Sequence, residues 1–402
     1  MNKINKDWKE VKLGDIVDIT MGQSPKSQFY NKINKGMPFL QGSSTFGHLY
    51  PSFEIYSSDI KKIAVNGSIL MSVRAPVGDL NMANTDICIG RGLCSINGKN
   101  KSLNRYIFYL LNYYKSKIVN IQTGTVFGAI SKDNILNFKV SIPQSEKEQK
   151  RIASILSALD DKIELNNKTN KILEEMAQTI FKEWFINFNF PNEDGKPYKK
   201  SGGEMIDSEL GKIPKGWKVI TLKDIISIAK GKKPNATSDK ITEKFTMPYL
   251  TINCYNNEAT EYTEYNEKMH VKELDIVMVM DGNAGKIFYG KEGILSSTMA
   301  KLIVEDSNLN ELVFYFLKSI EYDLMYHTVG SVIQHADKQY MLNKKFCVSL
   351  DNLERLSDIF KCIRKEISLN KKENEKLSNI RDSLLPKLMT LKGRRADGEI
   401  RV

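Results

Sequence analysis

The sequence has few of the residues from which metal sites and disulfide frameworks are built. Five cysteines and four histidines occur in 402 residues, and no two cysteines form a Cys-x-x-Cys pair. We therefore expect neither a structural zinc site nor the disulfide framework of a small secreted protein. His327 and His335 have no third ligand-like residue near them, so no metal site is predicted at the histidines either.

Long apolar runs are also absent. No stretch approaches the roughly 18–20 residues that a membrane-spanning helix requires, and the polar, lysine-containing start of the chain does not resemble a signal peptide. We expect no contact with membranes and a location in the cytoplasm. The composition, 41% hydrophobic and 27% charged, is that of a globular protein, and the length suits two to three domains.

Acidic residues are fewer than basic ones, which gives a net charge of +11. Excess positive charge favours a polyanionic partner such as DNA, because each neutralised phosphate releases condensed counterions. A general bias towards lysine would produce the same charge without DNA, so the charge alone does not decide between these explanations.

Two stretches of the sequence, residues 8–25 and 217–234, repeat each other. At a constant offset of 209 positions, eight of the eighteen aligned residues are identical. They are Trp8/Trp217, Lys9/Lys218, Leu13/Leu222, Asp15/Asp224, Ile16/Ile225, Ile19/Ile228, Gly22/Gly231 and Pro25/Pro234. Matches continue in the same order to Leu136/Leu342, with an offset that drifts only from 209 to 206. A colinear series of this kind indicates a tandem duplication.

Each half begins with short β-branched and aromatic runs punctuated by Gly, Pro and Asn, a pattern that predicts strands and turns. Residues 69–73 and 276–280 are predicted strands, and residues 103–114 and 309–317 are predicted helices. The expected fold is therefore an α+β domain in each half, over residues 1–143 and 217–350.

Each half then changes to one long helical pattern, over residues 144–189 and 351–391. A helix over residues 145–187 would be about 65 Å long at ~1.5 Å per residue, too long to be stable alone. Seam residues recur at alternating steps of four and three, which requires a partner helix. The seam residues are Leu159, Ile163, Asn166, Asn170, Leu173, Ala177, Ile180 and Trp184 in the first helix, and Ile363, Ile367, Asn370, Asn374, Leu377, Arg381, Leu384 and Leu388 in the second.

Asparagines interrupt this apolar seam at two equivalent places in each helix. A buried asparagine fixes the register of a coiled coil at some cost in stability. The alternative is that these side chains face solvent where the seam is loose. Pro386 is expected to bend or end the second helix, because proline lacks an N–H donor and its ring clashes with the preceding turn. Residues 190–216, polar and rich in turn formers at their start, are predicted as a linker, and residues 392–402 as a tail.

No catalytic motif is complete. Residues 281–286 resemble a phosphate-binding loop, but the spacing is short and Ile287 stands where a Ser or Thr would hold magnesium, so a hairpin turn is predicted. Gly90-Arg91-Gly92 lacks the rest of a dinucleotide-binding motif. The chain also lacks the Asn-Pro-Pro-aromatic motif of amino methyltransferases, and the nuclease-like residues 193–196 lie in the predicted linker. We expect a chain without a catalytic centre.

Several segments resemble the specificity subunits of type I restriction-modification systems. The run from Glu148 to Leu156 and the run from Leu159 to Asn166 are similar to the central helix of that family. Residues 195–203, residues 213–217 and the C-terminal residues 384–389 with 398–400 resemble its linker, the start of its second half and its C-terminus. Residues 390–396 depart from the family pattern, either as an insertion or as altered sequence.

The resemblance implies a tandem duplication of two mixed α/β target-recognition domains separated by two long helices that form an antiparallel coiled coil. Each domain would recognise one half of a bipartite site in double-stranded DNA. The helices would fix the gap and bind two adenine methyltransferase subunits, to which motor-nuclease restriction subunits can be added.

In such a type I complex, S-adenosylmethionine, ATP and magnesium would be held by the partner subunits and no cofactor by this chain. The alternatives are a stand-alone DNA-modifying enzyme, or a coiled-coil scaffold that binds protein.

Polar side chains recognise bases at their edges, whereas basic side chains and backbone amides position phosphates. Candidate DNA-binding residues are therefore polar or basic residues at equivalent turns of the two repeats. They are Gln23, Ser24, Gln41, Ser43, Arg74, Thr123, Thr125 and Phe127 in the first repeat, and Lys232, Lys233, Asn253, Asp281, Asn283, Ser331, Gln334 and His335 in the second.

Different side chains at matching positions are what two domains with different half-sites would carry. The alternative is that each candidate is an ordinary polar loop residue. Gly22 and Gly231, beside the first candidates, are interpreted as requirements of the backbone.

Overall fold

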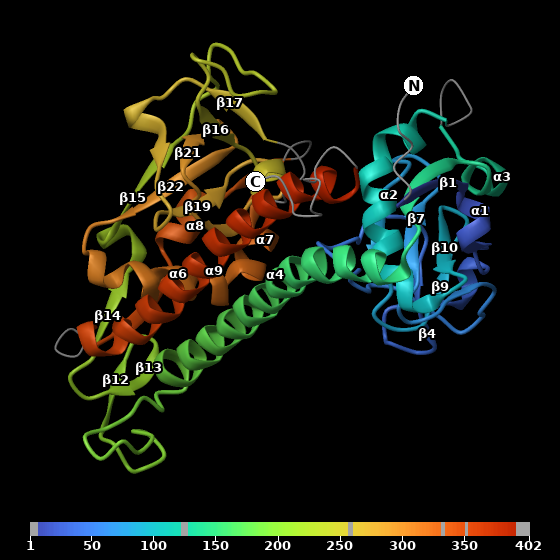
Figure 1. Cartoon of the computed structure of the whole chain (residues 1–402). Helices are drawn as coiled ribbons and strands as arrows, with labels where there is room; N and C mark the ends of the chain where they lie inside the picture. The colour runs from blue at the N-terminus through green and yellow to red at the C-terminus, as the bar shows by residue number, and fades with distance from the viewer. Residues whose placement is uncertain (1–6, 122–127, 256–259, 331–333, 350–352, 391–402) are drawn as a thin grey trace. The chain divides into compact units, whose positions relative to one another are not determined.

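The chain folds into two compact units (Figure 1). The structure, a computed structural model, describes residues 7–121, 128–255, 260–330, 334–349 and 353–390. Unit 1 consists of residues 1–168 and 369–402, and unit 2 of residues 169–368. The division falls within both long helices, so each unit combines one domain with a part of each helix. In the described part of the chain, no helix is both long enough and apolar enough to cross a membrane.

A four-stranded antiparallel sheet forms the centre of unit 1. Its strand order is β2 (Val17–Met21), β10 (Leu93–Gly98), β7 (Ile69–Ser72) and β8 (Leu80–Met82). Helix α2 (Asn104–Val119) covers this sheet (Figure 1) and buries Tyr106 and Tyr109 completely or nearly so. The strand predicted at residues 69–73 and the helix predicted at residues 103–114 are therefore confirmed.

Unit 1 contains a second sheet and a strand pair. The second sheet has the order β3 (Tyr30–Asn31), β5 (Tyr56–Ser57), β4 (Met37–Leu40), β9 (Ile87–Ile89) and β6 (Ile63–Ala64), in which β4 and β9 are parallel. The pair joins β1 (Trp8–Lys12) to β11 (Lys139–Pro143), the strand that leads into the first long helix. The short helices are α1 (Leu13–Ile16) and α3 (Lys132–Leu136), with 3₁₀ turns η1 (Ser27–Phe29) and η2 (Lys101–Leu103).

Unit 2 repeats this architecture, which confirms the tandem duplication. Its central sheet has the equivalent order β15 (Ile226–Lys230), β22 (Met299–Val304), β19 (Ile276–Val279) and β20 (Ile287–Tyr289), covered by α6 (Asn310–Ser319). The second sheet is β17 (Glu261–Thr263), β16 (Met247–Leu250), β21 (Gly293–Leu295) and β18 (His270–Val271), and the strand pair is β14 (Lys218–Thr221) with β25 (Lys345–Val348).

The smaller elements of unit 2 complete the domain. They are α5 (Ile252–Tyr255), α7 (Glu321–Tyr326), α8 (Lys338–Leu342), the pair β23 (Thr328–Val329) with β24 (His335–Ala336), and 3₁₀ turns η4 (Leu222–Asp224), η5 (Glu267–Met269) and η6 (Ser307–Leu309). The segment that resembles a phosphate-binding loop connects β19 to β20, which pair antiparallel, so the predicted hairpin turn is confirmed.

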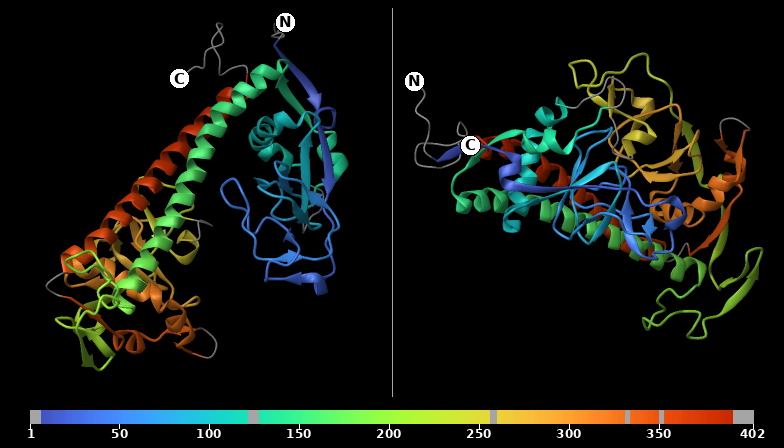
Figure 2. Two further views of the ribbon diagram at one scale, coloured as in Figure 1. Left: turned by 90° about the horizontal axis from the view of Figure 1, so that it is seen from below. Right: turned by 90° about the vertical axis from the view of Figure 1, so that its right-hand side faces the viewer.

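The two long helices are α4 (Glu146–Phe181), which continues into a π-helical turn η3 (Lys182–Ile186), and α9 (Leu353–Leu388). Within unit 1, Asn166 bonds to Asn374 and Asp160 to Arg381, so the two helices run antiparallel there (Figure 2). Asn166 is 3% exposed, which excludes the solvent-facing alternative for this residue. Helix α9 continues through Pro386 and ends two residues later at Leu388, so the proline lies inside the last turn and does not itself end the helix.

The segment predicted as a linker is folded against the core of unit 2. Phe190 stacks on Tyr198 and on Trp217, with ring centroids 4.7 and 4.8 Å apart respectively. The following residues form a hairpin of β12 (Met205–Ser208) and β13 (Gly211–Pro214). The composition of this segment is mostly polar and does not predict such packing. The packing is made by a few aromatic side chains within it.

Candidate functional site

In unit 1, four loops meet at one end of the two sheets. They follow β2, β4 and β7 and connect β9 to β10. Backbone hydrogen bonds tie them together: the Gln23 amide donates to the Ile89 carbonyl at 2.9 Å, and the Gly92 amide donates to the Gln41 carbonyl at 3.2 Å. We call residues 22–24, 41–43, 73–76 and 90–92 the unit 1 edge. Most of the candidate residues of the first repeat lie on it.

Unit 2 has the equivalent arrangement. Residues 231–233, 251–253, 280–283, 296–298 and 334–335 form the unit 2 edge. The Gly231 amide donates to the Met299 carbonyl at 3.0 Å, and the Ser296 amide donates to the Leu250 carbonyl at 3.1 Å. The two repeats therefore bring their candidate residues together in the same way.

The repeated glycines beside these loops are required by close packing. A Cβ atom on Gly22 would lie 2.1 Å from the Gly90 carbonyl oxygen, and one on Gly231 would lie 2.2 Å from that of Ser296. No side chain fits at such distances, so glycine lets the loop after the first strand of the sheet approach its neighbour. Glycine is required at positions 78 and 285 for a different reason. The φ angles there, 86° and 94°, lie in the left-handed region that favours glycine.

The candidate side chains of unit 1 differ in whether their polar atoms already form hydrogen bonds within the unit. Ser24 donates to the Gln41 carboxamide oxygen at 2.8 Å and accepts from the Arg91 amide at 3.2 Å, so these three residues act as one group. Ser43 donates to Asp79, which also pairs with Lys115, so its hydroxyl is already engaged.

Other candidates of the first repeat are more available, or lie outside the described part of the chain. Arg74 and the side chain of Gln23 are exposed. Thr123, Thr125 and Phe127 lie outside the described residues.

Asp281 is the centre of the unit 2 edge. Its carboxylate lies 2.7 Å from Nδ1 of His335 and 3.6 Å from Nζ of Lys230. The backbone carbonyl of Gln334 accepts a hydrogen bond from the Gly282 amide at 3.0 Å. Asn283 is exposed in the same turn.

The remaining candidates of the second repeat are solvent-accessible. Lys232 and Lys233 are exposed and line a cavity of about 240 Å³ with Tyr265 and Asn266. Asn253 is exposed on α5. Ser331 lies outside the described residues.

Two basic residues, one on the unit 1 edge and one next to the unit 2 edge, were missed by sequence reasoning. Arg91 is exposed on the unit 1 edge, but its Gly-Arg-Gly setting was tested only as a dinucleotide motif. Lys230 aligns with Met21, so the repeat comparison does not single it out. A search for every basic residue next to a candidate turn would have included both.

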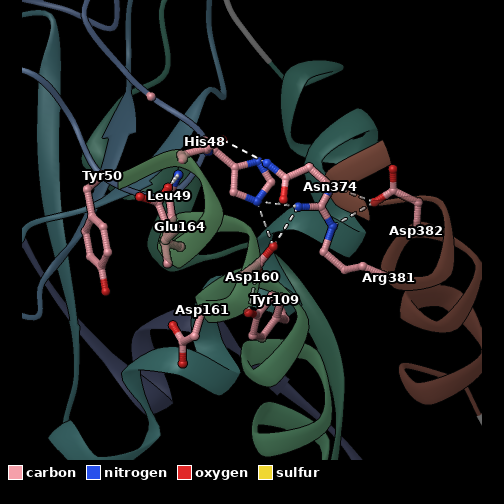
Figure 3. A network of polar contacts seen from close by, with 12 residues as sticks. His48, Leu49, Tyr50, Tyr109, Asp160, Asp161, Glu164, Asn374, Arg381 and Asp382 are labelled. Carbon is pink, nitrogen blue, oxygen red and sulfur yellow. Dashed lines mark hydrogen bonds and ion pairs between the residues drawn. The ribbon is translucent and has the colours of Figure 1, made fainter. Parts of the chain in front are cut away.

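A buried polar network holds the helices of unit 1 to its domain (Figure 3). Asp160 on α4 is 2% exposed. It accepts from Tyr109 on α2 at 2.6 Å, from His48 at 3.0 Å and from Arg381 on α9 at 2.7 Å. Burial raises the pKa of Asp160, but the hydrogen bonds from His48, Tyr109 and Arg381 outweigh burial and hold the pKa below its ordinary value. The aspartate is therefore ionised and fixed in place.

Two further contacts strengthen the same joint. The Arg105 guanidinium lies 2.6 Å from the Asp161 carboxylate, and the Leu49 amide donates to Glu164 at 3.0 Å. The three acidic residues, Asp160, Asp161 and Glu164, lie within little more than one turn of α4, so this part of the helix is bound to the domain through its acidic side chains. Such a network positions the unit 1 edge relative to the helices of the same unit.

Unit 2 uses different residues for the corresponding joint. Glu311 on α6 is 4% exposed and accepts a hydrogen bond from Tyr289. Arg364 on α9 stacks on the Tyr289 ring, 3.5 Å from its centroid, and donates to the Glu273 carbonyl at 3.1 Å. Burial raises the pKa of Glu311 above its ordinary value. Sequence reasoning missed this cluster as well, since each member lies in an otherwise ordinary helix or strand.

The geometry of the edges suits recognition by hydrogen bonds and charge. Exposed donors and acceptors are held on short loops between rigid strands. Within the described residues, no group of three or more His, Cys, Asp and Glu side chains is arranged to hold a metal ion.

Comparison with known proteins gives matches along most of the chain. Residues 5–175 and 214–379 match the family model described as the type I restriction modification DNA specificity domain. A Methanocaldococcus jannaschii protein assigned as the MjaX specificity subunit of a type I restriction enzyme is 44% identical over 183 residues, which cover 45% of this chain and 43% of that protein. This match therefore spans less than half of the relative.

Two longer matches cover nearly the whole chain. The MjaIX specificity subunit of a type I restriction enzyme, from the same organism, is 26% identical over 437 residues, covering 100% of this chain and 95% of that protein. The crystal structure of the S subunit of a type I restriction-modification system from M. genitalium superposes with a TM-score of 0.59 at 16% identity, covering 97% of this chain and 98% of that one. The structural match shows a shared fold.

Proposed function

Because the chain belongs to the family of type I restriction-modification DNA specificity proteins, we propose that each of its units recognises one half of a bipartite DNA site. The observation that carries this proposal is the pair of equivalent edges. The same loops meet at the same end of the same sheets in both units, whereas their exposed side chains differ. A duplicated scaffold with divergent loops is what recognition of two different half-sites requires.

The net charge of +11 supports a DNA partner. Exposed Arg91 on the unit 1 edge, and Lys232 and Lys233 on the unit 2 edge, place positive charge beside the candidate base-recognition groups. Basic side chains there would contact phosphates, while neighbouring polar groups contact bases.

The long helices are proposed to bind partner subunits. Large apolar side chains remain exposed on both of them: Leu165 is 58% and Leu369 51% exposed in unit 1, and Ile172 is 56% and Met176 49% exposed in unit 2. Exposed apolar side chains on a helix are typical of a surface that another protein covers. We assign this surface to two adenine methyltransferase subunits, with motor-nuclease subunits joining the complex where they are present.

In this proposal the chain contributes recognition and positioning in the cytoplasm and no catalytic group. S-adenosylmethionine belongs to the methyltransferase subunits, and ATP and magnesium to the motor-nuclease subunits. The complex would then act as an adenine-specific DNA methyltransferase and, with the motor subunits, as a type I site-specific deoxyribonuclease.

The experiment that tests this proposal is a genome-wide map of methylated adenines in host cells, with the gene intact and deleted. The expected result is one bipartite motif with a fixed gap that loses methylation on deletion and regains it on complementation. An unchanged methylation map in a strain that expresses the protein together with its methyltransferase would contradict the proposal and favour a scaffold that binds protein.

A further inference from the structure

Arg74 and Asp281 occupy the same place in the two repeats. Each follows the third strand of its central sheet, and each forms an isolated antiparallel bridge, Arg74 with Ala129 and Asp281 with His335. The flanking backbone bonds also correspond. The Ile130 amide donates to the Val73 carbonyl at 3.1 Å in unit 1, and the Ala336 amide donates to the Met280 carbonyl at 2.8 Å in unit 2.

The charges at this common position are opposite. The exposed Arg74 guanidinium has no hydrogen-bond or ion-pair partner within the described part of the chain. Its bridge partner, Ala129, adds no polar side chain, and the residue that corresponds to Lys230 is Met21. The unit 1 edge therefore presents a guanidinium, which can only donate hydrogen bonds.

The unit 2 edge presents acceptors at this position. Since an ionised carboxylate cannot donate, Nδ1 of His335 donates to Asp281 at 2.7 Å. In the neutral ring this leaves Nε2 as an acceptor, and the second carboxylate oxygen faces Lys230 only at 3.6 Å. His335 is 50% and Asp281 21% exposed at the side chain, so both can be approached from solvent.

We propose that Arg74 recognises a guanine in one half-site, and that Asp281 with His335 recognises the exocyclic amino group of adenine or cytosine in the other. In the major groove, guanine offers two acceptors, O6 and N7, which match a guanidinium fork. The adenine N6 and cytosine N4 amino groups are donors, which match a carboxylate and a neutral imidazole. The two units thus select base edges of opposite hydrogen-bonding character. This inference rests on the proposed function, because it assumes that both edges face DNA.

The test uses the full chain with its methyltransferase partner in a host without other adenine methylation. Methylated motifs are compared for the unaltered chain, Arg74→Lys and Asp281→Asn. Lysine keeps the positive charge but loses the two-pronged geometry, so we expect methylation to persist while one G·C position relaxes. A good bidentate contact favours the correct base over the wrong one by roughly 5- to 150-fold. We expect Arg74→Lys to lose base discrimination of that size. Asp281→Asn should relax one position in the other half-site only.

A binding assay with modified DNA identifies the atom. Replacing the guanine at the relaxed position by 7-deazaguanine removes N7. This change should weaken binding of the unaltered complex and have little further effect on the Arg74→Lys complex. Matched controls are Lys99→Ala and Glu305→Ala, which remove one exposed charge at the opposite end of β10 and of β22, and both should leave the motif unchanged.

The outcomes separate the two proposals. If the unaltered chain directs no bipartite motif, the proposed function fails and this inference fails with it. If the motif is bipartite but either variant leaves it unchanged, relaxes the same half-site as the other, or abolishes methylation completely, the inference is overturned while the proposed function stands. An A·T pair at the Arg74-dependent position would overturn it as well.

Discussion

Arg381 places a guanidinium nitrogen 2.7 Å from a carboxylate oxygen of Asp160, a residue 221 positions earlier in the chain. The two side chains join α9 to α4 within unit 1, and Tyr109 and His48 attach the same carboxylate to the domain. A residue near the C-terminus is therefore part of the structure of the N-terminal domain.

Arg381→Ala should destabilise unit 1 by about 3 kcal/mol, because it leaves a buried carboxylate without its charged partner. The measurement is the unit 1 transition in urea-induced unfolding. Asp382→Ala is the matched control: its carboxylate is 64% exposed and pairs with the same arginine, so the expected change is under ~0.5 kcal/mol. In a double-mutant cycle with Asp160→Ala, strict additivity of the two effects would contradict a direct interaction.

The depressed pKa of Asp160 predicts acid sensitivity. A carboxyl whose pKa is lower in the folded state stabilises the fold at pH values above its unfolded pKa of ~3.9. This contribution is lost as the pH falls through the lower, folded pKa. The unfolding free energy of the unaltered chain minus that of Asp160→Asn should therefore shrink below about pH 4. A difference that stays constant with pH would show that ionisation of Asp160 contributes nothing.

Glu311 predicts the opposite dependence, because burial raises its pKa. The folded state then holds the proton more tightly, so stability is complete below the unfolded pKa of ~4.3 and falls as the pH rises through the folded pKa. Glu311→Gln mimics the protonated form and should lose less stability than the unaltered chain between roughly pH 4.5 and neutrality. Glu305→Gln, an exposed change in the same unit, should follow the unaltered chain.

Gly22→Ala should disrupt the unit 1 edge, because the added Cβ would lie 2.1 Å from the Gly90 carbonyl oxygen. We expect a loss of roughly 1–3 kcal/mol in stability, as for other overpacked sites, together with weaker DNA binding by the complex. Gly42→Ala is a close control on the same edge, since its Cβ would meet no atom within 4 Å. Equal stability and equal DNA binding for the two variants would refute the packing argument.

DNA binding by the complex should weaken steeply with salt. If roughly 6–10 phosphates are neutralised, affinity falls by about 10³–10⁵ between 50 and 200 mM salt. Lys232→Ala and Lys233→Ala should each reduce the slope of log affinity against log salt by about 1 and weaken all sequences alike. Fluorescence anisotropy with cognate and scrambled duplexes measures both effects. A slope unchanged in both variants would place these lysines away from the phosphates.

The regular elements were predictable from sequence because their signals are local. The strand at residues 69–73 and the hairpin turn at residues 281–286 follow from apolar runs and turn residues that lie next to one another. The duplication made these predictions firmer, because the same strands and helices had to be predicted at equivalent positions in both halves.

The joints between helices and domains were not predictable in this way. The Asp160–Arg381 pair spans 221 positions, and nothing in the sequence near either residue indicates the other. Sequence reasoning placed Arg381 on the helix seam, which is where it lies, but not its partner. The edges were an intermediate case. Alignment of the repeats located Arg74 and Asp281, but Lys230 becomes relevant only when the turn brings it within 3.6 Å of Asp281.

The composition of unit 1 has a consequence for synthesis of the protein. Residues 1–168 leave the ribosome first, yet the unit also requires residues 369–390, among them Leu388 and Met389, which are buried in its core. At ~5–20 residues per second, roughly 10–40 s separate these two parts. During that interval the nascent N-terminal domain exposes the apolar surface that α9 later covers. Chaperone binding, or early capture by a partner subunit, would therefore act on the first half of the chain before translation ends.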